Sequence, residues 1–186
     1  MDAIIFVHPA NRVSHNAVIL EHVKGRLAGQ GTEFKVIDLY SDGFDPILRT
    51  ESGKAGYSEE VKRCQGILAA SDRVIFIYPV WWYNMPAVLK GFIDRIFTSG
   101  FAFDYKLEDG KPFIRPLMNG KKAVVINTYG HGEELFRRYG KCSEKVLDEA
   151  VLGFCGFEVK RVNWFDIRKP SDIPDKIKRE IDLALG

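Results

Sequence analysis

The sequence has few cysteines and no long apolar run. Its three cysteines, Cys64, Cys142 and Cys155, are widely spaced and form no C-x-x-C motif. An odd, scattered set argues against a disulfide framework and favours a reducing compartment. No stretch reaches the roughly 18 uninterrupted apolar residues of a membrane-spanning helix, and no basic segment precedes the first apolar run, so no signal peptide is expected. We therefore expect a cytoplasmic protein without stable membrane insertion.

An excess of charge of one sign is also lacking. The chain has 27 Lys and Arg residues against 25 Asp and Glu residues, which gives a formal net charge of +2. Because the two signs are interspersed, no basic stripe forms, and we expect no nucleic-acid partner.

Several catalytic and nucleotide-binding motifs are missing. No G-x-G-x-x-G follows the first apolar run and no G-x-x-x-x-G-K-S/T occurs, which disfavours Rossmann dinucleotide binding and P-loop chemistry. H-E-x-x-H and G-x-S-x-G are also absent. His8, His15 and His22 recur every seven residues, but no acidic or thiol partner completes a ligand set, so no metal is expected.

Short apolar runs alternate with segments of helical period along the whole chain. Apolar, β-rich runs predict five strands, at residues 3–7, 34–39, 74–78, 123–126 and 157–167, of which 3–7 and 74–78 are continuously apolar. Caps and helical spacing predict helices that begin near Ser14, Ser58 and Pro86, a helix within residues 133–154, and a last helix from about residue 171. Five such units predict a single α/β domain over residues 1–186, with a five-stranded parallel sheet in the order 2-1-3-4-5.

The helical phase predicts which side chains face the core. The expected inward positions are Leu20, Val23 and Leu27 in the first helix, Val61, Cys64 and Leu68 in the second, and Ile173, Ile177, Ile181 and Leu185 in the last. Cys64 is therefore expected to be an inert buried thiol. Two long connections, residues 40–57 and 100–121, are expected to be loops, and the second is expected to be functional or an interface.

Ligands of an open parallel sheet bind beyond the carboxyl ends of the strands, where the strand order reverses. The order 2-1-3-4-5 places that point between the first and third strands, and an unusual segment follows each of them. After the first strand, residues 8–17 carry His8, Arg12, Ser14 and Asn16 toward a helix N-terminus, which suits an anion. An ordinary turn with Ser14 as the helix cap explains the same residues equally well.

The segments after the third and fourth strands complete this edge. Residues 78–86 gather Trp81, Trp82 and Tyr83 in a loop, which suits a planar aromatic ligand, although a hydrophobic plug or a subunit interface would use the same residues. In residues 127–133, glycines allow main-chain N–H groups to approach a ligand. His131 is there a candidate proton donor, or a solvated histidine in a flexible turn.

These segments resemble the flavodoxin-2 group of NAD(P)H quinone oxidoreductases, which includes modulator-of-drug-activity and potassium-efflux ancillary proteins. The match runs through His8-Pro9 and Ser14-His15-Asn16-Ala17, through Asp38-Leu39-Tyr40 and Phe44-Asp45-Pro46, through residues 78–95, and on to Gly100-Phe101-Ala102-Phe103. The loop after the fourth strand departs from it: relatives usually have Thr-Thr-Gly-Gly where this chain has Asn127-Thr128-Tyr129-Gly130.

The resemblance implies a flavodoxin-like three-layer sandwich that transfers a hydride from NAD(P)H through a bound flavin to a quinone or similar small planar acceptor. FMN is the preferred cofactor and FAD the alternative. His8, Ser14, Asn16 and Ala17 would hold the flavin phosphate and ribityl chain, and Pro79, Val80, Trp81, Trp82 and Tyr83 would line the ring. Asn127, Thr128, Tyr129 and Gly130 would approach its polar edge, with main-chain donors at Tyr129 and Gly130 stabilising the reduced form. Tyr83 and His131 are the candidate catalytic residues.

The resemblance also implies a homodimer with the flavin near the interface, to which residues 100–121 would contribute. Two other functions stay open: a flavin-binding regulatory subunit of a potassium-efflux-type transporter, and a flavodoxin-like electron carrier, which the net charge of +2 disfavours. The choice between NADPH and NADH is open as well. Arg137 and Arg138 suit a 2′-phosphate, and a solvated helix face explains them equally well.

Overall fold

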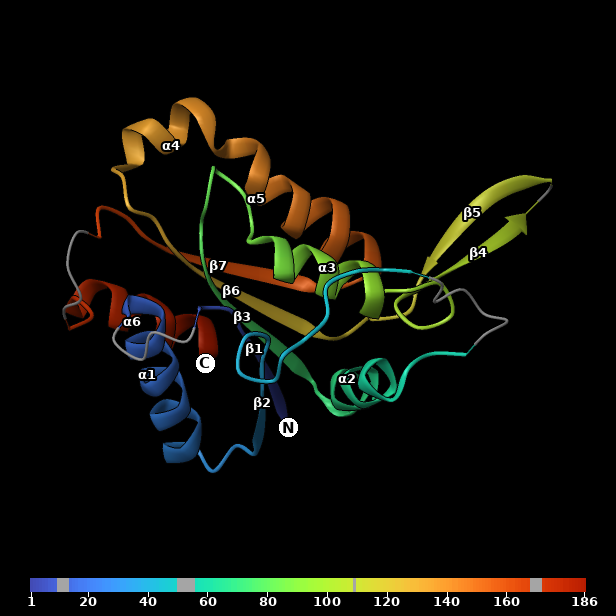
Figure 1. The fold of residues 1–186 in the computed structure, drawn as a ribbon, viewed down its shortest axis with the longest axis horizontal. Helices are drawn as coiled ribbons and strands as arrows, with labels where there is room; N and C mark the ends of the chain where they lie inside the picture. Colours follow the sequence, from blue (N-terminus) through green and yellow to red (C-terminus); the bar gives the residue numbers. More distant parts are fainter. Residues whose placement is uncertain (10–13, 50–55, 109, 168–171) are drawn as a thin grey trace.

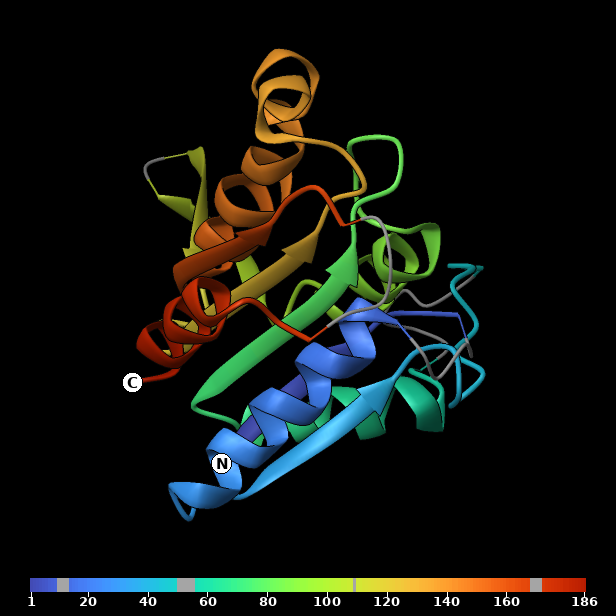
Figure 2. The same cartoon turned by 90° about the vertical axis from the view of Figure 1, so that its left-hand side faces the viewer.

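The computed structural model describes residues 1–9, 14–49, 56–108, 110–167 and 172–186. Five parallel strands form one sheet, and helices cover both of its faces (Figures 1 and 2). The strands are β1 (Asp2–Phe6), β2 (Phe34–Asp38), β3 (Arg73–Pro79), β6 (Lys122–Thr128) and β7 (Glu158–Trp164). The predicted flavodoxin-like α/β architecture with a five-stranded parallel sheet is therefore confirmed.

The predicted strand order, 2-1-3-4-5, needs a correction to β2-β1-β3-β6-β7. Two additional strands, β4 (Phe103–Glu108) and β5 (Lys111–Pro116), pair antiparallel in the connection that was expected to be a loop. This hairpin projects from the body of the molecule and does not join the main sheet (Figure 1). The order still reverses between β1 and β3, so the carboxyl ends of these two strands remain the expected ligand edge.

Alternation along the strands builds two cores. Ala3 and Ile5 of β1 pack against the helices of one face, while Ile4 and Phe6 pack against the helices of the other, because successive strand side chains point to opposite faces. The first face carries α2 (Glu59–Ala70), α3 (Ala87–Ile96), α5 (Lys141–Leu147) and the π-helical turn η1 (Asp148–Gly153). The second face carries α1 (His15–Gly29) and α6 (Asp175–Leu185), and the short α4 (Glu133–Tyr139) stands above the sheet edge (Figure 2).

Most of the predicted helix faces are confirmed, with two corrections. In α1 the fully buried partner of Val23 and Leu27 is Ile19, and Leu20 is only half-buried. The last helix begins at Asp175, later than expected, because Pro174 disfavours a helical conformation for the residue before it. Ile173 is buried all the same, from the segment that precedes the helix.

Cys64 lies fully buried on the inner face of α2, as its helical phase predicts. Burial raises the pKa of its thiol to about 11, so the thiol is protonated at neutral pH and inert. In the part of the chain that the structure describes, no helix is long and apolar enough to cross a membrane.

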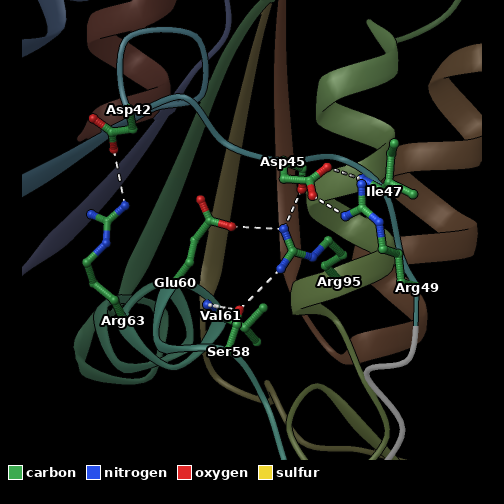
Figure 3. Close-up of polar contacts among 9 residues, drawn as sticks. All are labelled: Asp42, Asp45, Ile47, Arg49, Ser58, Glu60, Val61, Arg63 and Arg95. Atoms are coloured by element: carbon green, nitrogen blue, oxygen red, sulfur yellow. Dashed lines mark hydrogen bonds and ion pairs between the residues drawn. The ribbon is translucent and has the colours of Figure 1, made fainter.

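The connection after β2 is anchored to α3 by Arg95, whose side chain is 5% exposed (Figure 3). Its guanidinium donates to Glu60 Oε2 at 2.8 Å, to Ser58 Oγ at 3.2 Å and to the main-chain carbonyl of Asp45. It also lies over the ring of Phe44, with 5.1 Å between Cζ and the ring centroid. These contacts fix the connection at the same end of the sheet as the predicted ligand edge.

Candidate functional site

The segments after β1, β3 and β6 meet at the carboxyl edge of the sheet, where the strands in Figure 2 point. Buried hydrogen bonds tie them together. Thr128 Oγ1, at the end of β6, donates to Asn16 Oδ1 at 2.9 Å, and Val80 N–H, after β3, donates to the Thr128 carbonyl at 2.9 Å. Residues far apart in the sequence thus form one continuous site.

The first segment begins α1 with a capped turn. Ser14 has an extended backbone (φ −138°), and its hydroxyl accepts the Ala17 N–H at 3.1 Å, so the N-cap interpretation of Ser14 is confirmed. His8 is half-buried and its Nδ1 lies 2.8 Å from the Pro9 carbonyl. Arg12, a further candidate anion ligand, falls outside the described residues.

Two buried side-chain nitrogens at this helix terminus have no hydrogen-bond partner among the described residues. They are His15 Nε2 and Asn16 Nδ2, in side chains that are 8% and 1% exposed. The edge of the His15 ring packs against Trp164, with 4.8 Å between the ring centroids. An unpaired buried polar group costs about 1–3 kcal/mol, so these two atoms are candidates to bind a polar ligand.

The segment after β3 forms a strained turn. Trp81 and Asn84 exchange two main-chain hydrogen bonds of 3.0 Å, and the residues between them, Trp82 and Tyr83, have φ values of +50° and +57°. Positive φ at both central positions is the type I′ pattern, which Gly and Asn adopt easily and aromatic residues adopt only under strain. Such strain gathers at ligand clamps. No described residue accepts a hydrogen bond from the N–H of Trp82 or Tyr83.

The side chains of this turn do not all line one wall. Trp82 is 96% exposed and Trp81 is 42% exposed, and their place beside a ligand stays a prediction. Tyr83 instead leans back toward the segment after β6, where its ring lies 4.9 Å from the His131 ring and 5.7 Å from the Tyr139 ring. The two candidate catalytic residues, Tyr83 and His131, are therefore brought together.

His131 is held by its own backbone. Its Nδ1 lies 3.1 Å from the Gly132 carbonyl. A proton on Nδ1 would donate to that carbonyl and leave Nε2 as the nitrogen that can exchange a proton with a ligand. The main-chain carbonyl of His131 accepts the N–H of Asp166, which is itself at φ +61°.

The segment after β6 contributes less than its sequence suggested. The Asn127 side chain is fully buried, donates to the Tyr78 carbonyl at 3.3 Å and accepts from Arg161, so it is directed into the protein. Tyr129 is also fully buried, with its ring stacked on Phe165 at 4.6 Å. The Tyr129 N–H donates to the Trp164 carbonyl at 2.9 Å. The main-chain donor expected at Tyr129 is therefore already engaged, which leaves Gly130 for that role.

A partly buried ionic cluster packs beside this segment. Arg161 donates to both oxygens of Asp148, at 2.8 and 2.6 Å, and lies 3.7 Å from Glu144. Burial lowers the pKa of Arg161, but the hydrogen bonds to Asp148 and the charge interactions with Tyr78, Asp148 and Glu144 together outweigh burial and raise it. Burial raises the pKa of Tyr78 and of Tyr129, so both hydroxyls stay protonated at neutral pH and neither acts as a base. Among the described residues no group of three His, Cys, Asp or Glu side chains could hold a metal ion.

The sequence missed two residues of this edge. His15 lies in the first segment, but its position in the helical repeat is also that of a core residue, so the sequence did not distinguish the two roles. Tyr139 had no sequence signal, since it joins Tyr83 only because α4 folds over the edge.

Comparison with known proteins agrees with this geometry. Residues 3–182 match the family model Flavodoxin_2, described as a flavodoxin-like fold. An uncharacterized NAD(P)H oxidoreductase of Haemophilus influenzae is 29% identical over 97% of this chain and 90% of that protein. NAD(P)H dehydrogenase [quinone] 1 of Cavia porcellus is 30% identical over 84% of this chain, which spans 65% of that protein.

A solved structure is similar as well. The NAD(P)H:quinone oxidoreductase of Methanothermobacter marburgensis superposes with a TM-score of 0.73 at 27% identity, over 98% of this chain and 89% of that one. The fold, its carboxyl-edge site and these matches lead to one assignment: this chain is a member of the flavodoxin-2 family.

Proposed function

We propose that this oxidoreductase of the NAD(P)H dehydrogenase (quinone) type binds a flavin at the edge between β1 and β3. There it would pass electrons from NAD(P)H to a quinone or a similar small planar acceptor. The observation that supports this most is the pair of unpartnered buried donors, His15 Nε2 and Asn16 Nδ2, at the N-terminus of α1. The names of the relatives agree with the activity.

The start of α1 fits a phosphate. Free N–H groups and the helix dipole favour an anion there, and His15 and Asn16 add two side-chain donors that the protein itself does not use. Ser14 keeps its hydroxyl hydrogen for a further acceptor while its oxygen caps the helix. The phosphate of a flavin nucleotide would satisfy these donors. We propose FMN before FAD, because a terminal phosphate carries more charge for them than either phosphate of the FAD pyrophosphate does.

The turn after β3 fits the ring of a flavin. The main-chain N–H groups of Trp82 and Tyr83 are exposed on a rigid turn, and they match the nitrogen and carbonyl acceptors at the polar edge of an isoalloxazine. On the far side, Gly130 adds a backbone with no side chain in the way. These groups would orient the ring, and the strained turn would hold them in place before the ligand arrives.

When bound, the flavin supplies the hydride chemistry, and the protein supplies placement and proton handling. His131 would exchange a proton with the acceptor through Nε2, because its Nδ1 is occupied by the Gly132 carbonyl. Tyr83, 4.9 Å away between ring centroids, would orient His131 and exclude water from one side. Gly130 N–H would face the developing negative charge, since Tyr129 N–H is engaged elsewhere.

We further propose that the protein is a homodimer. Two groups of large exposed apolar side chains stand out: Trp81 and Trp82 at the site turn, and Tyr105, Leu107 and Phe113 on the β4–β5 hairpin. A two-stranded hairpin is only marginally stable by itself in water, so a surface that covers it would stabilise it. Analytical ultracentrifugation tests this: a dimer supports the proposal, and a monomer at micromolar concentration contradicts it.

An anaerobic titration tests the function. Purified protein reconstituted with FMN is titrated with NADPH or NADH and then with menadione, while the visible flavin bands are followed. We expect two-electron bleaching that menadione reverses, without an accumulating one-electron form. Binding of flavin without reduction by either nucleotide would indicate a carrier or a regulatory subunit, and no binding of flavin would contradict the proposal at its base.

A further inference from the structure

Two neighbouring arginines at the end of α4 differ in their partners. Arg137 is held by Glu133, whose Oε1 accepts from Nε at 3.2 Å and from Nη2 at 2.8 Å. Arg138 has no carboxylate partner among the described residues. Its guanidinium lies over the ring of Tyr139, with 5.1 Å between Cζ and the ring centroid. Of the two, Arg138 therefore keeps its hydrogen-bond donors available for an anion.

A chain of aromatic contacts links Arg138 to the site. The Tyr139 ring that supports it is 5.7 Å from the Tyr83 ring, which in turn is 4.9 Å from the His131 ring. Because the guanidinium is stacked on a ring, its planar fork is partly fixed in position before any ligand binds. Arg138 is thus a pre-positioned cation at the rim of the proposed nicotinamide site.

The chemistry of the two nucleotide donors makes this position informative. NADPH and NADH differ only by a phosphate on the 2′-oxygen of the adenosine ribose. A guanidinium binds a phosphate through two parallel N–H···O bonds, which are among the stronger hydrogen bonds in proteins. A nucleotide whose nicotinamide lies beside Tyr83 and His131 must send its adenosine half outward over the rim of the site.

Resting on the proposed function, we propose that Arg138 binds the 2′-phosphate of NADPH and makes NADPH the preferred electron donor. Arg137, paired with Glu133, does not take part. The proposal selects one of the two phosphorylation states of the nucleotide, and one of two adjacent residues of the same type.

The kinetic test compares kcat/KM for NADPH and for NADH in the wild type, Arg138→Ala, Arg138→Lys and the matched control Arg137→Ala. We expect wild-type preference for NADPH. Arg138→Ala should lower kcat/KM for NADPH about 10- to 100-fold, the value of a charge-assisted hydrogen bond, and leave NADH unchanged. Arg138→Lys should restore part of the loss, because it keeps the charge without the fork. Arg137→Ala should change neither value.

A binding measurement gives a readout that does not depend on turnover. Adenosine 2′,5′-bisphosphate and adenosine 5′-monophosphate are titrated into the flavin-loaded protein by calorimetry, and only the bisphosphate should lose affinity in Arg138→Ala. Equal losses for both nucleotides, a wild-type preference for NADH, or a changed preference in Arg137→Ala would overturn the assignment. If neither NADH nor NADPH reduces the flavin in the wild type, the proposed function has failed. That outcome is distinct from an error in the assignment of Arg138 to the 2′-phosphate.

Discussion

Two buried polar centres of this protein differ in whether their groups have partners. The guanidinium of Arg95 donates hydrogen bonds to side-chain oxygens of Glu60 and Ser58 and to the main-chain carbonyl of Asp45 (Figure 3). At the start of α1, His15 Nε2 and Asn16 Nδ2 are buried with no partner among the described residues. The first centre is complete in the protein alone and therefore serves the fold. The second leaves two buried nitrogens available to a ligand, and it lies at the edge where the strand order reverses.

The largest expected effect is on the complete centre. Arg95→Met should destabilise the flavin-free protein by about 2–4 kcal/mol, because it leaves Glu60 and the Asp45 carbonyl without their donor. Urea denaturation measures this. The control is Arg49→Ala, which removes an exposed partner of Asp45 in the same cluster and should cost less than about 1 kcal/mol. Equal effects of the two variants would mean that burial does not distinguish these pairs.

The incomplete centre should respond in the opposite way. His15→Phe keeps the ring contact with Trp164 and removes the unpaired nitrogen. We expect the free energy of unfolding of the flavin-free protein to be unchanged or slightly higher. Flavin affinity should fall about tenfold, which corresponds to the loss of one hydrogen bond to a charged group. Fluorescence titration with FMN measures the affinity. A loss of stability with unchanged affinity would make His15 a structural residue.

The comparison can be sharpened at two helical glycines. A Cβ on Gly91 would lie 2.2 Å from the Pro46 carbonyl oxygen, so Gly91→Ala should force the connection after β2 off α3 and cost about 1–3 kcal/mol. A Cβ on Gly66, in the interior of α2, meets nothing within 4 Å. Gly66→Ala should therefore stabilise the protein by roughly 0.5–1 kcal/mol. Opposite shifts of the urea midpoint would confirm that close packing, and not helix propensity, keeps Gly91.

The smallest effect is expected at the strained turn. Trp82→Asn places a residue that tolerates a positive φ where Trp82 has +50°, and it should stabilise the flavin-free protein by about 0.5–1 kcal/mol. Trp82 is almost fully exposed, so little packing is lost in a monomer. The free energy of unfolding is measured at protein concentrations below and above the dissociation constant of the proposed dimer. A clear loss of stability in Trp82→Asn would show that the partner covers Trp82.

Much of the fold could be predicted because parallel strands that are buried on both faces have continuous apolar sequences. The strands β1, β3 and β6 followed from that pattern, β2 and β7 from less continuous β-rich runs, and the inner face of α2 from its helical period. The hairpin was missed although Phe103, Tyr105 and Leu107 alternate with polar residues before Asp109-Gly110, a hairpin signal that the charged and proline residues of the segment outweighed. The strand numbering was wrong for that reason.

The candidate site was predictable only in its location. The strand order indicated the carboxyl edge of the sheet, and the motifs indicated the candidate residues Ser14, Asn16, Tyr83 and His131. Which groups are already engaged depends on tertiary contacts: Tyr129 N–H is bound by Trp164, and the Asn127 side chain by Arg161. No local pattern records such contacts, nor the approach of Tyr139 to Tyr83.

A crystal structure of the protein grown with FMN tests the central claim most directly. We expect one flavin per chain, with its phosphate within hydrogen-bonding distance of His15 Nε2 and Asn16 Nδ2 and its ring against the turn at Trp82 and Tyr83. A flavin bound elsewhere, with these two donors still unpaired, would contradict it.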